Sequence, residues 1–175
     1  MSYFEELNKS MKHLSKKKKI MFIGQAVEYP GTAMFNTLKG INKSKLFELP
    51  VAEEMQMGMT LGLALEGYIP ISIYPRWNFL LLATNQIVNH LDKIKTISEN
   101  QFQPKLIIRT AVGSIKPLDP QSQHRGNFSK AFRNLCKNIR VVELKNKNRI
   151  FDEYKKAYNY KGISLMVEFA DLYNS

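Results

Sequence analysis

The chain has 175 residues and a mass of 20.2 kDa, which fits one domain with a substantial buried core. Its single cysteine, Cys136, excludes an internal disulfide and a zinc site built from several cysteines. No apolar run approaches the roughly 20 residues that span a bilayer, and the polar start of the chain is unlike a secretory signal, so we expect a cytoplasmic protein.

The chain is strongly basic, with 26 lysine and arginine residues against 15 acidic ones and a formal net charge of +11. Such a balance can favour nucleic acid, an anionic surface or an acidic partner. The basic residues are scattered, apart from Lys16 to Lys19 and Lys145 to Arg149, and no helix-turn-helix, zinc-finger or RNA-recognition signature accompanies them. We therefore predict no nucleic-acid and no membrane partner, and we assign the charge to solvated surface that suits a diphosphate cofactor or an acidic subunit.

Helical periodicity alternates with short apolar runs along the chain. In chain order the pattern predicts a helix at 3–18, a strand at 19–27, a helix at 33–39, a strand at 45–49, a helix at 52–66, a strand at 69–74, a helix at 79–97, a strand at 106–110, a helix at 128–136, a strand at 139–144, a helix at 150–158 and a strand at 164–169. This alternation implies crossover connections. We expect one domain over residues 1–175, a three-layer αβα fold with a mainly parallel sheet and helices on both faces.

Sheets of this kind bind ligands beyond the carboxyl ends of their strands. That edge should carry Gln25, the segment 50–53, the segment 74–79 and the loop at 113–123 that follows Arg109. We therefore place the candidate site there.

The stretch from 46 to 94 contains an ordered set of motifs. In order they are Pro50-Val51-Ala52-Glu53, Gly58 with Gly62, Gly67-Tyr68-Ile69-Pro70, Phe79, and Asn85-Gln86-Ile87-Val88-Asn89. This set resembles the pyrimidine-binding domain of the beta subunit of 2-oxo acid dehydrogenases and, more distantly, that of transketolases. The resemblance extends more weakly over 22–27, 108–110, Gly113 and 123–124, and so covers most of the chain.

The resemblance implies that Glu53 hydrogen-bonds N1′ of the aminopyrimidine of thiamine diphosphate, so that the cofactor can lose its C2 proton. A carboxyl at a strand end and helix start suits this role, because burial raises its pKa while the helix N-terminus lowers it. The alternative is that Glu53 and Glu54 simply serve the first turn of a helix, where acids are favoured by roughly 0.3–1 kcal/mol. Within the motif we predict that Glu53 is functional and Glu54 is the ordinary helix-start acid.

Four further residues are candidates. Phe79 matches the aromatic residue that packs on the aminopyrimidine, although core packing is the alternative. Tyr74 and Trp77 lie on the same connection, and either could line the pocket. His124 lies near the position where the family presents a histidine to the substrate, although an exposed loop histidine would look the same. Gln25 stands where the family has acidic residues beside the cofactor. Arg76 has no family counterpart, and could contact an anionic substrate or a partner.

The family holds the diphosphate and its Mg²⁺ on a second domain with a Gly-Asp-Gly motif, which this sequence lacks. We therefore predict that the diphosphate-binding and C-terminal domains are absent and that an alpha-like subunit supplies the diphosphate site, in a homodimer or heterotetramer. The implied reaction is cleavage of the C–C bond next to the carbonyl of a 2-oxo acid or ketose. The alternatives are a transketolase-type subunit and a non-catalytic interaction or regulatory remnant of the fold.

Overall fold

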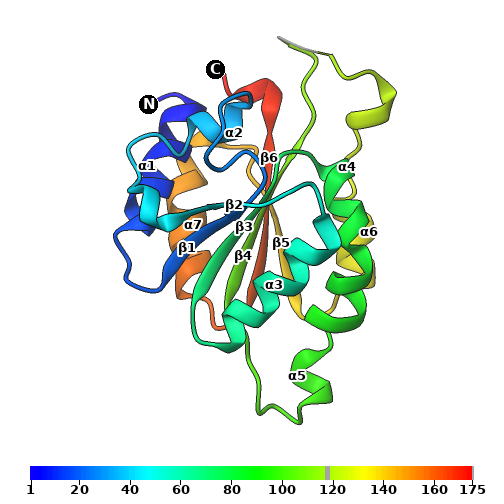
Figure 1. Cartoon of the computed structure of the whole chain (residues 1–175). Helices are drawn as coiled ribbons and strands as arrows, with labels where there is room; N and C mark the ends of the chain where they lie inside the picture. Colours follow the sequence, from blue (N-terminus) through cyan, green and yellow to red (C-terminus); the bar gives the residue numbers. More distant parts are fainter. Residues whose placement is uncertain (117–118, 175) are drawn as a thin grey trace.

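The computed structural model describes residues 1–116 and 119–174, so residues 117 and 118 of the predicted loop at 113–123 lie outside the description. At its centre is a parallel sheet of six strands in the order β2-β1-β3-β4-β6-β5 (Figure 1). The strands are β1 (Ile20–Gly24), β2 (Leu46–Glu48), β3 (Ile69–Tyr74), β4 (Leu106–Val112), β5 (Ile139–Glu143) and β6 (Ile163–Phe169). The predicted three-layer fold is confirmed, and every strand pair is parallel.

Helices cover both faces of the sheet (Figure 1). They are α1 (Tyr3–Ser15), α2 (Ala33–Asn36), α3 (Glu53–Leu65), α4 (Trp77–Leu80), α5 (Ile94–Ile97), α6 (Ser129–Leu135) and α7 (Ile150–Asn159). Helix α1 starts with a reciprocal capping box between Ser2 and Glu5. Among the described residues, no helix is long and apolar enough to cross a membrane.

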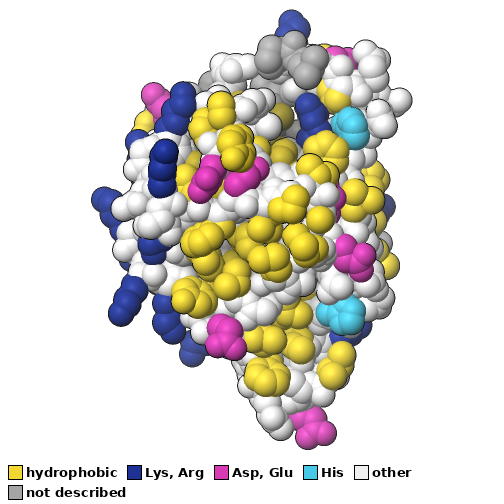
Figure 2. All heavy atoms as spheres, in the orientation of Figure 1, with side chains coloured by type: hydrophobic (Ala, Val, Ile, Leu, Met, Phe, Trp, Pro, Cys, Tyr) yellow, Lys and Arg dark blue, Asp and Glu magenta, His cyan; other side chains and the backbone are white. Residues whose placement is uncertain are grey.

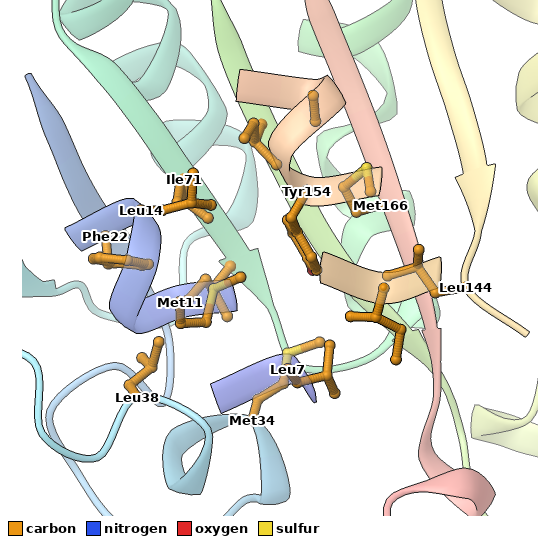
Figure 3. Close-up of a cluster of buried hydrophobic side chains, with 14 of the residues drawn as sticks. Leu7, Met11, Leu14, Phe22, Met34, Leu38, Ile71, Leu144, Tyr154 and Met166 are labelled. Carbon is orange, nitrogen blue, oxygen red and sulfur yellow. The ribbon is translucent and has the colours of Figure 1, made fainter. Parts of the chain in front are cut away.

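Two apolar clusters hold the layers together. On one face, α1 and α7 pack against the sheet through fully buried side chains such as Leu7, Met11 and Tyr154 (Figure 3). On the other face, α3, α4 and α6 enclose a second cluster around Trp77. Because both faces are buried, strands β3, β4 and β6 read as nearly continuous apolar runs rather than alternating ones.

The segment predicted as one long helix at 79–97 is broken into short helical pieces. Helix α4 passes through a 3₁₀ turn into a π-helical turn at Gln86–Leu91, and α5 follows only at Ile94. The backbone carbonyl of Asp92 accepts a 2.7 Å hydrogen bond from the side chain of Asn138, while the Asp92 carboxylate accepts one of 2.7 Å from the Asn138 backbone N–H. These tertiary contacts interrupt the helical ladder at a point where the local sequence has no breaker.

The chain reverses its direction of winding between β1 and β3. From β1 it crosses to β2 at the sheet edge, and then returns to the other side of β1 to form β3. Such a switch point opens a crevice at the carboxyl ends of the strands, where open parallel sheets bind their ligands. Gly24 ends β1 there with a φ of +138°, a conformation that side chains rarely adopt.

We expect Gly24→Ala to lower the free energy of unfolding by about 2–4 kcal/mol, from left-handed backbone strain plus overpacking. An added Cβ would overlap the carbonyl of Ile73 and lie 2.5 Å from Nε2 of Gln56. Gly31→Ala is the matched control, because Gly31 has a φ of +142° but an added Cβ would meet no atom of the described residues beyond its chain neighbours within 4 Å. Urea unfolding measures both variants, and equal losses would contradict a steric role for Gly24.

Candidate functional site

The switch point carries a cleft of about 1270 Å³. Its walls come from β1 and β2, the loop after β1, the segments that follow β2 and β3, and helices α3 and α4. Three of the predicted site residues, Gln25, Glu53 and Phe79, line it. Segments far apart in the sequence thus meet where the strand order reverses. The prediction that the site lies at the carboxyl edge of the sheet is consistent with this geometry.

Glu53 is the first residue of α3 and is only 5% exposed. Its side chain lines the cleft, and among the described residues its carboxylate accepts no hydrogen bond. The backbone carbonyl of Glu53 accepts a 3.2 Å hydrogen bond from the hydroxyl of Tyr74, whose pKa burial raises well above its usual value. The next residue is different: Glu54 is exposed and accepts a 2.9 Å hydrogen bond from Asn85 of the last motif. Glu53 is therefore the acid of this pair that is available to a ligand.

A buried polar network fixes the angle of α3. The side-chain amide of Gln56 donates to Ser72 Oγ at 3.1 Å and to the carbonyl of Ile73 at 2.9 Å, and the hydroxyl of Thr60 donates to Ser72 Oγ at 2.9 Å. All three side chains are fully buried. Because these bonds tie one face of α3 to β3, the first turn of the helix, with Glu53, is held rigidly over the cleft.

The loop after β1 is shaped by Glu48, which ends β2. The Glu48 carboxylate accepts hydrogen bonds of 2.9, 2.7 and 2.7 Å from the backbone N–H groups of Ala26, Val27 and Glu28. This holds Ala26 at a φ of +55° and brings Gln25 into the cleft wall. Gln25 is 9% exposed, and its Nε2 has no hydrogen-bond partner among the described residues. The loop therefore offers an unused donor to whatever fills the cleft.

We expect Glu48→Gln to loosen this loop, because the amide replaces one acceptor oxygen with a donor and leaves backbone N–H groups unpaired. The local cost is about 1–3 kcal/mol, which corresponds to amide exchange that is roughly fivefold to 150-fold faster at residues 26–28. Hydrogen exchange followed by NMR measures it. Glu28→Gln is the control, since the Glu28 side chain is exposed. Unchanged exchange in Glu48→Gln would show that the carboxylate does not order the loop.

Phe79 and His124 lie side by side. Phe79 lines the cleft, and its ring centroid is 5.2 Å from that of His124. His124 itself is not among the residues that line the cleft, but it is half-buried and its Nδ1 has no partner in the part of the chain that the structure describes. Two nearby aromatics do not reach the cleft: Tyr74 and Trp77 are wholly buried, and Trp77 packs against Phe132.

Sequence reasoning did not single out Glu48. Its signal is an acidic residue at the carboxyl end of a short strand, a position that faces the ligand edge in this fold class. Sequence reasoning also did not predict how much apolar surface is exposed beside the cleft. Figure 2 shows hydrophobic side chains gathered over α3, and we name as the apolar face the exposed residues Phe47, Val51, Met55, Met59 and Leu82. Apart from its chain neighbours and the backbone of α3 itself, no described atom lies within 4 Å of a Cβ placed at Gly62, so the glycine face of α3 is open there.

The chain is similar over nearly its whole length to beta subunits of 2-oxo acid dehydrogenases. It is 25% identical over 176 residues to the pyruvate dehydrogenase E1 component subunit beta of Chlorokybus atmophyticus, a match that covers 98% of this chain and 51% of the relative. It is 26% identical over 118 residues to the 2-oxoisovalerate dehydrogenase subunit beta of Bacillus subtilis, covering 65% of this chain and 36% of the relative. The chain thus spans about half the length, or less, of these curated relatives, and no family model matches it.

Relatives named mitochondrial and chloroplastic occur in Ascaris suum and Oryza sativa, so the cytoplasmic location stays a prediction. Among solved structures, a split gene transketolase described as an inactive beta4 tetramer has a TM-score of 0.71 with 18% sequence identity, covering 97% of this chain and 52% of that chain. At that identity the likeness shows the fold. Together these comparisons show that the chain is similar to the beta subunits of 2-oxo acid dehydrogenases and shares its fold with part of a split gene transketolase.

Proposed function

We propose that the chain is the pyrimidine-binding subunit of a thiamine-diphosphate enzyme and that Glu53 activates the cofactor. The observation that carries the proposal is the setting of Glu53: a nearly buried carboxylate at the start of α3 that faces a cleft at the switch point of the sheet and meets no hydrogen-bond donor among the described residues. A buried carboxylate without a partner costs stability, and functional sites are where such costs are retained. The similarity to 2-oxo acid dehydrogenase beta subunits supports the choice of cofactor.

The side chains of the cleft fit an aminopyrimidine. Glu53 would share a proton with a ring nitrogen, since its oxygens are not committed elsewhere in the described structure. Phe79 would offer a flat apolar face to the ring, and the free Nε2 of Gln25 would donate to a ring or substrate acceptor. When bound, thiamine diphosphate supplies the nucleophilic carbon and takes up the electron pair that is released when the C–C bond breaks. His124, against Phe79, would hold or pass a proton at Nδ1 toward the substrate carbonyl.

The proposal assigns the diphosphate and Mg²⁺ to an alpha-like partner subunit. In the residues that the structure describes there is no group of three or more His, Cys, Asp or Glu side chains that could hold a metal ion. The apolar face beside the cleft supports a partner at this position, because contiguous exposed apolar side chains of this kind mark protein interfaces.

The excess positive charge would speed association with an acidic partner. The assembly would be a heterotetramer or would contain a homodimer of this chain.

The reaction we propose is cleavage of the bond next to the carbonyl of a 2-oxo acid, because both relatives described above act in 2-oxo acid dehydrogenases by name. The direct test is calorimetric titration of thiamine diphosphate with Mg²⁺ into the chain alone, into a candidate subunit that carries a Gly-Asp-Gly motif, and into their mixture. We expect binding in the mixture that exceeds the sum of the separate signals. A stable complex that binds no thiamine diphosphate would leave an interaction or regulatory module on this fold.

A further inference from the structure

We propose that Arg76 is a specificity-determining residue that binds an anionic group of the substrate, a carboxylate or a phosphate, at the rim of the cleft. The inference rests on the proposed function, since it assumes that the substrate enters the cleft that holds Glu53. It adds a charge requirement that the relatives' names do not contain.

Arg76 lies where a substrate in this cleft would meet it. It follows β3 directly after Pro75, is half-buried, and lines the cleft together with Glu53 and Phe79. Its guanidinium lies against the backbone of Gly113 beyond β4, because a Cβ placed on Gly113 would be 2.8 Å from Nη1 of Arg76. Because Gly113 has no side chain, the Arg76 guanidinium fits beside the backbone of Gly113, next to the loop that carries His124.

Arg76 differs from every other arginine of the chain in its lack of a counter-ion. Within the described residues its guanidinium makes no hydrogen bond and no ion pair. The other five arginines all pair with a carboxylate, in the pairs Arg109–Glu168, Arg125–Asp119, Arg133–Glu143, Arg140–Glu153 and Arg149–Glu153. A half-buried guanidinium loses part of its hydration, and without a nearby anion no interaction offsets that loss of free energy. Because its planar guanidinium carries five N–H donors and none of them is used, Arg76 is suited to bind two oxygens of one carboxylate or phosphate at the same time.

Further donors near Arg76 are also unused. The buried Nε2 of Gln25 lines the same cleft, and Nδ1 of His124 is buried behind Phe79, each without a partner in the described structure. Three acids line the cleft: Glu48 already accepts three backbone hydrogen bonds, and neither Glu28 nor Glu53 forms an ion pair with Arg76 in the described structure. The cleft therefore combines one unpaired cation, Arg76, with the unpaired donor of Gln25, and His124 lies next to it against Phe79.

The bound anion has to be remote from the reacting carbonyl. A guanidinium on the carboxylate that leaves as carbon dioxide would stabilise the ground state more than the transition state, in which that charge disperses, and so would slow the reaction. A cation in the cleft of such an enzyme aids catalysis only if it binds a group of the substrate that keeps its charge throughout the reaction. The structure thus assigns to this chain a substrate that carries a second anionic group.

The test uses two matched pairs of probes: 2-oxoglutarate with 2-oxopentanoate, and xylulose 5-phosphate with xylulose. Each is titrated by calorimetry into the chain alone and into the thiamine-diphosphate complex, while the fluorescence of Trp77, the only tryptophan and the neighbour of Arg76, is recorded. We expect at least one charged probe to bind about tenfold to a hundredfold tighter than its match, as a charged hydrogen-bonded contact provides. Selectivity for the first pair identifies a carboxylate, and selectivity for the second a phosphate.

Arg76→Gln should abolish this selectivity, and Arg76→Lys, which keeps the charge without the planar fork, should retain part of it. Arg125→Gln is the control with the same change in net charge, since Arg125 is already paired with Asp119. Should Arg76→Gln fail to fold, the comparison of Arg76→Lys with the wild-type chain decides. Equal binding of charged and uncharged probes, or selectivity unchanged by the Arg76 variants, would overturn the inference. Absence of thiamine diphosphate binding would instead count against the proposed function, and the titrations of the chain alone would still decide about Arg76.

Discussion

Arg109→Met is expected to lower the free energy of unfolding by about 3–5 kcal/mol, the cost of leaving a buried charge without its partner. Arg109 is wholly buried in β4, and its Nε and Nη2 donate to the two carboxylate oxygens of Glu168 in β6, which is equally buried. Tyr154 and Tyr173 also donate to this carboxylate. Burial alone would lower the pKa of Arg109, but the adjacent carboxylate outweighs it and raises the pKa of the guanidinium.

Urea unfolding followed by Trp77 fluorescence measures this cost. Arg125→Met is the matched control, because the Arg125–Asp119 pair is partly exposed and should contribute only about 0–1 kcal/mol. The double variant Arg109→Met with Glu168→Leu should recover part of the loss, since it removes the uncompensated charge as well. A loss below about 1 kcal/mol in Arg109→Met would mean that water or a rearranged tyrosine compensates Glu168.

Glu53→Gln is expected to lower turnover of a 2-oxo acid by the complex by about 10²- to 10⁴-fold, the usual contribution of one positioned proton-transfer group. Glutamine has nearly the same size and can still form a hydrogen bond, but it cannot share a proton with the aminopyrimidine. Binding of thiamine diphosphate should therefore change much less than turnover. Steady-state kinetics of the reconstituted complex measures the first quantity, and calorimetry measures the second.

Glu54→Gln supplies the control for this prediction. Glu54 has the same charge and lies one residue further along α3, but it is exposed and bonded to Asn85. Its replacement should leave turnover within a few-fold of the wild-type value. Equal losses in the two variants would mean that the helix start needs its acids for stability, and that neither acid acts on the cofactor.

The sequence was informative where the physics is local. Period-based reasoning located all six strands, because a parallel sheet covered on both faces requires apolar runs such as the one in β3. It also placed Gln25, Glu53 and Phe79 at one edge of the sheet, and all three line one cleft. The identity of Glu53 as the available acid depended on a family motif, since two adjacent glutamates at a helix start look alike without structure.

What the sequence could not provide are contacts between distant segments. The Glu168 carboxylate meets Arg109 because β4 and β6 are neighbours in register, and 59 residues separate the two in the chain. The break in the predicted helix at 79–97 depends on Asn138, again far away in sequence. Glu48 and the unpaired state of Arg76 are likewise properties of three-dimensional neighbours. The burial of Tyr74 and Trp77, two candidates to line the cleft, follows from packing against β4 and α6.

The central claim, that Glu53 of this chain activates thiamine diphosphate, is tested most directly by the rate at which the C2 proton of the bound cofactor exchanges with deuterium. The exchange is measured by NMR after rapid quenching, in the complex with the diphosphate-binding subunit, for the wild-type chain, Glu53→Gln and Glu54→Gln. The account predicts exchange that is accelerated over free cofactor in the wild type and in Glu54→Gln, and about 10²-fold or more slower in Glu53→Gln. Equal exchange rates in all three complexes would contradict it.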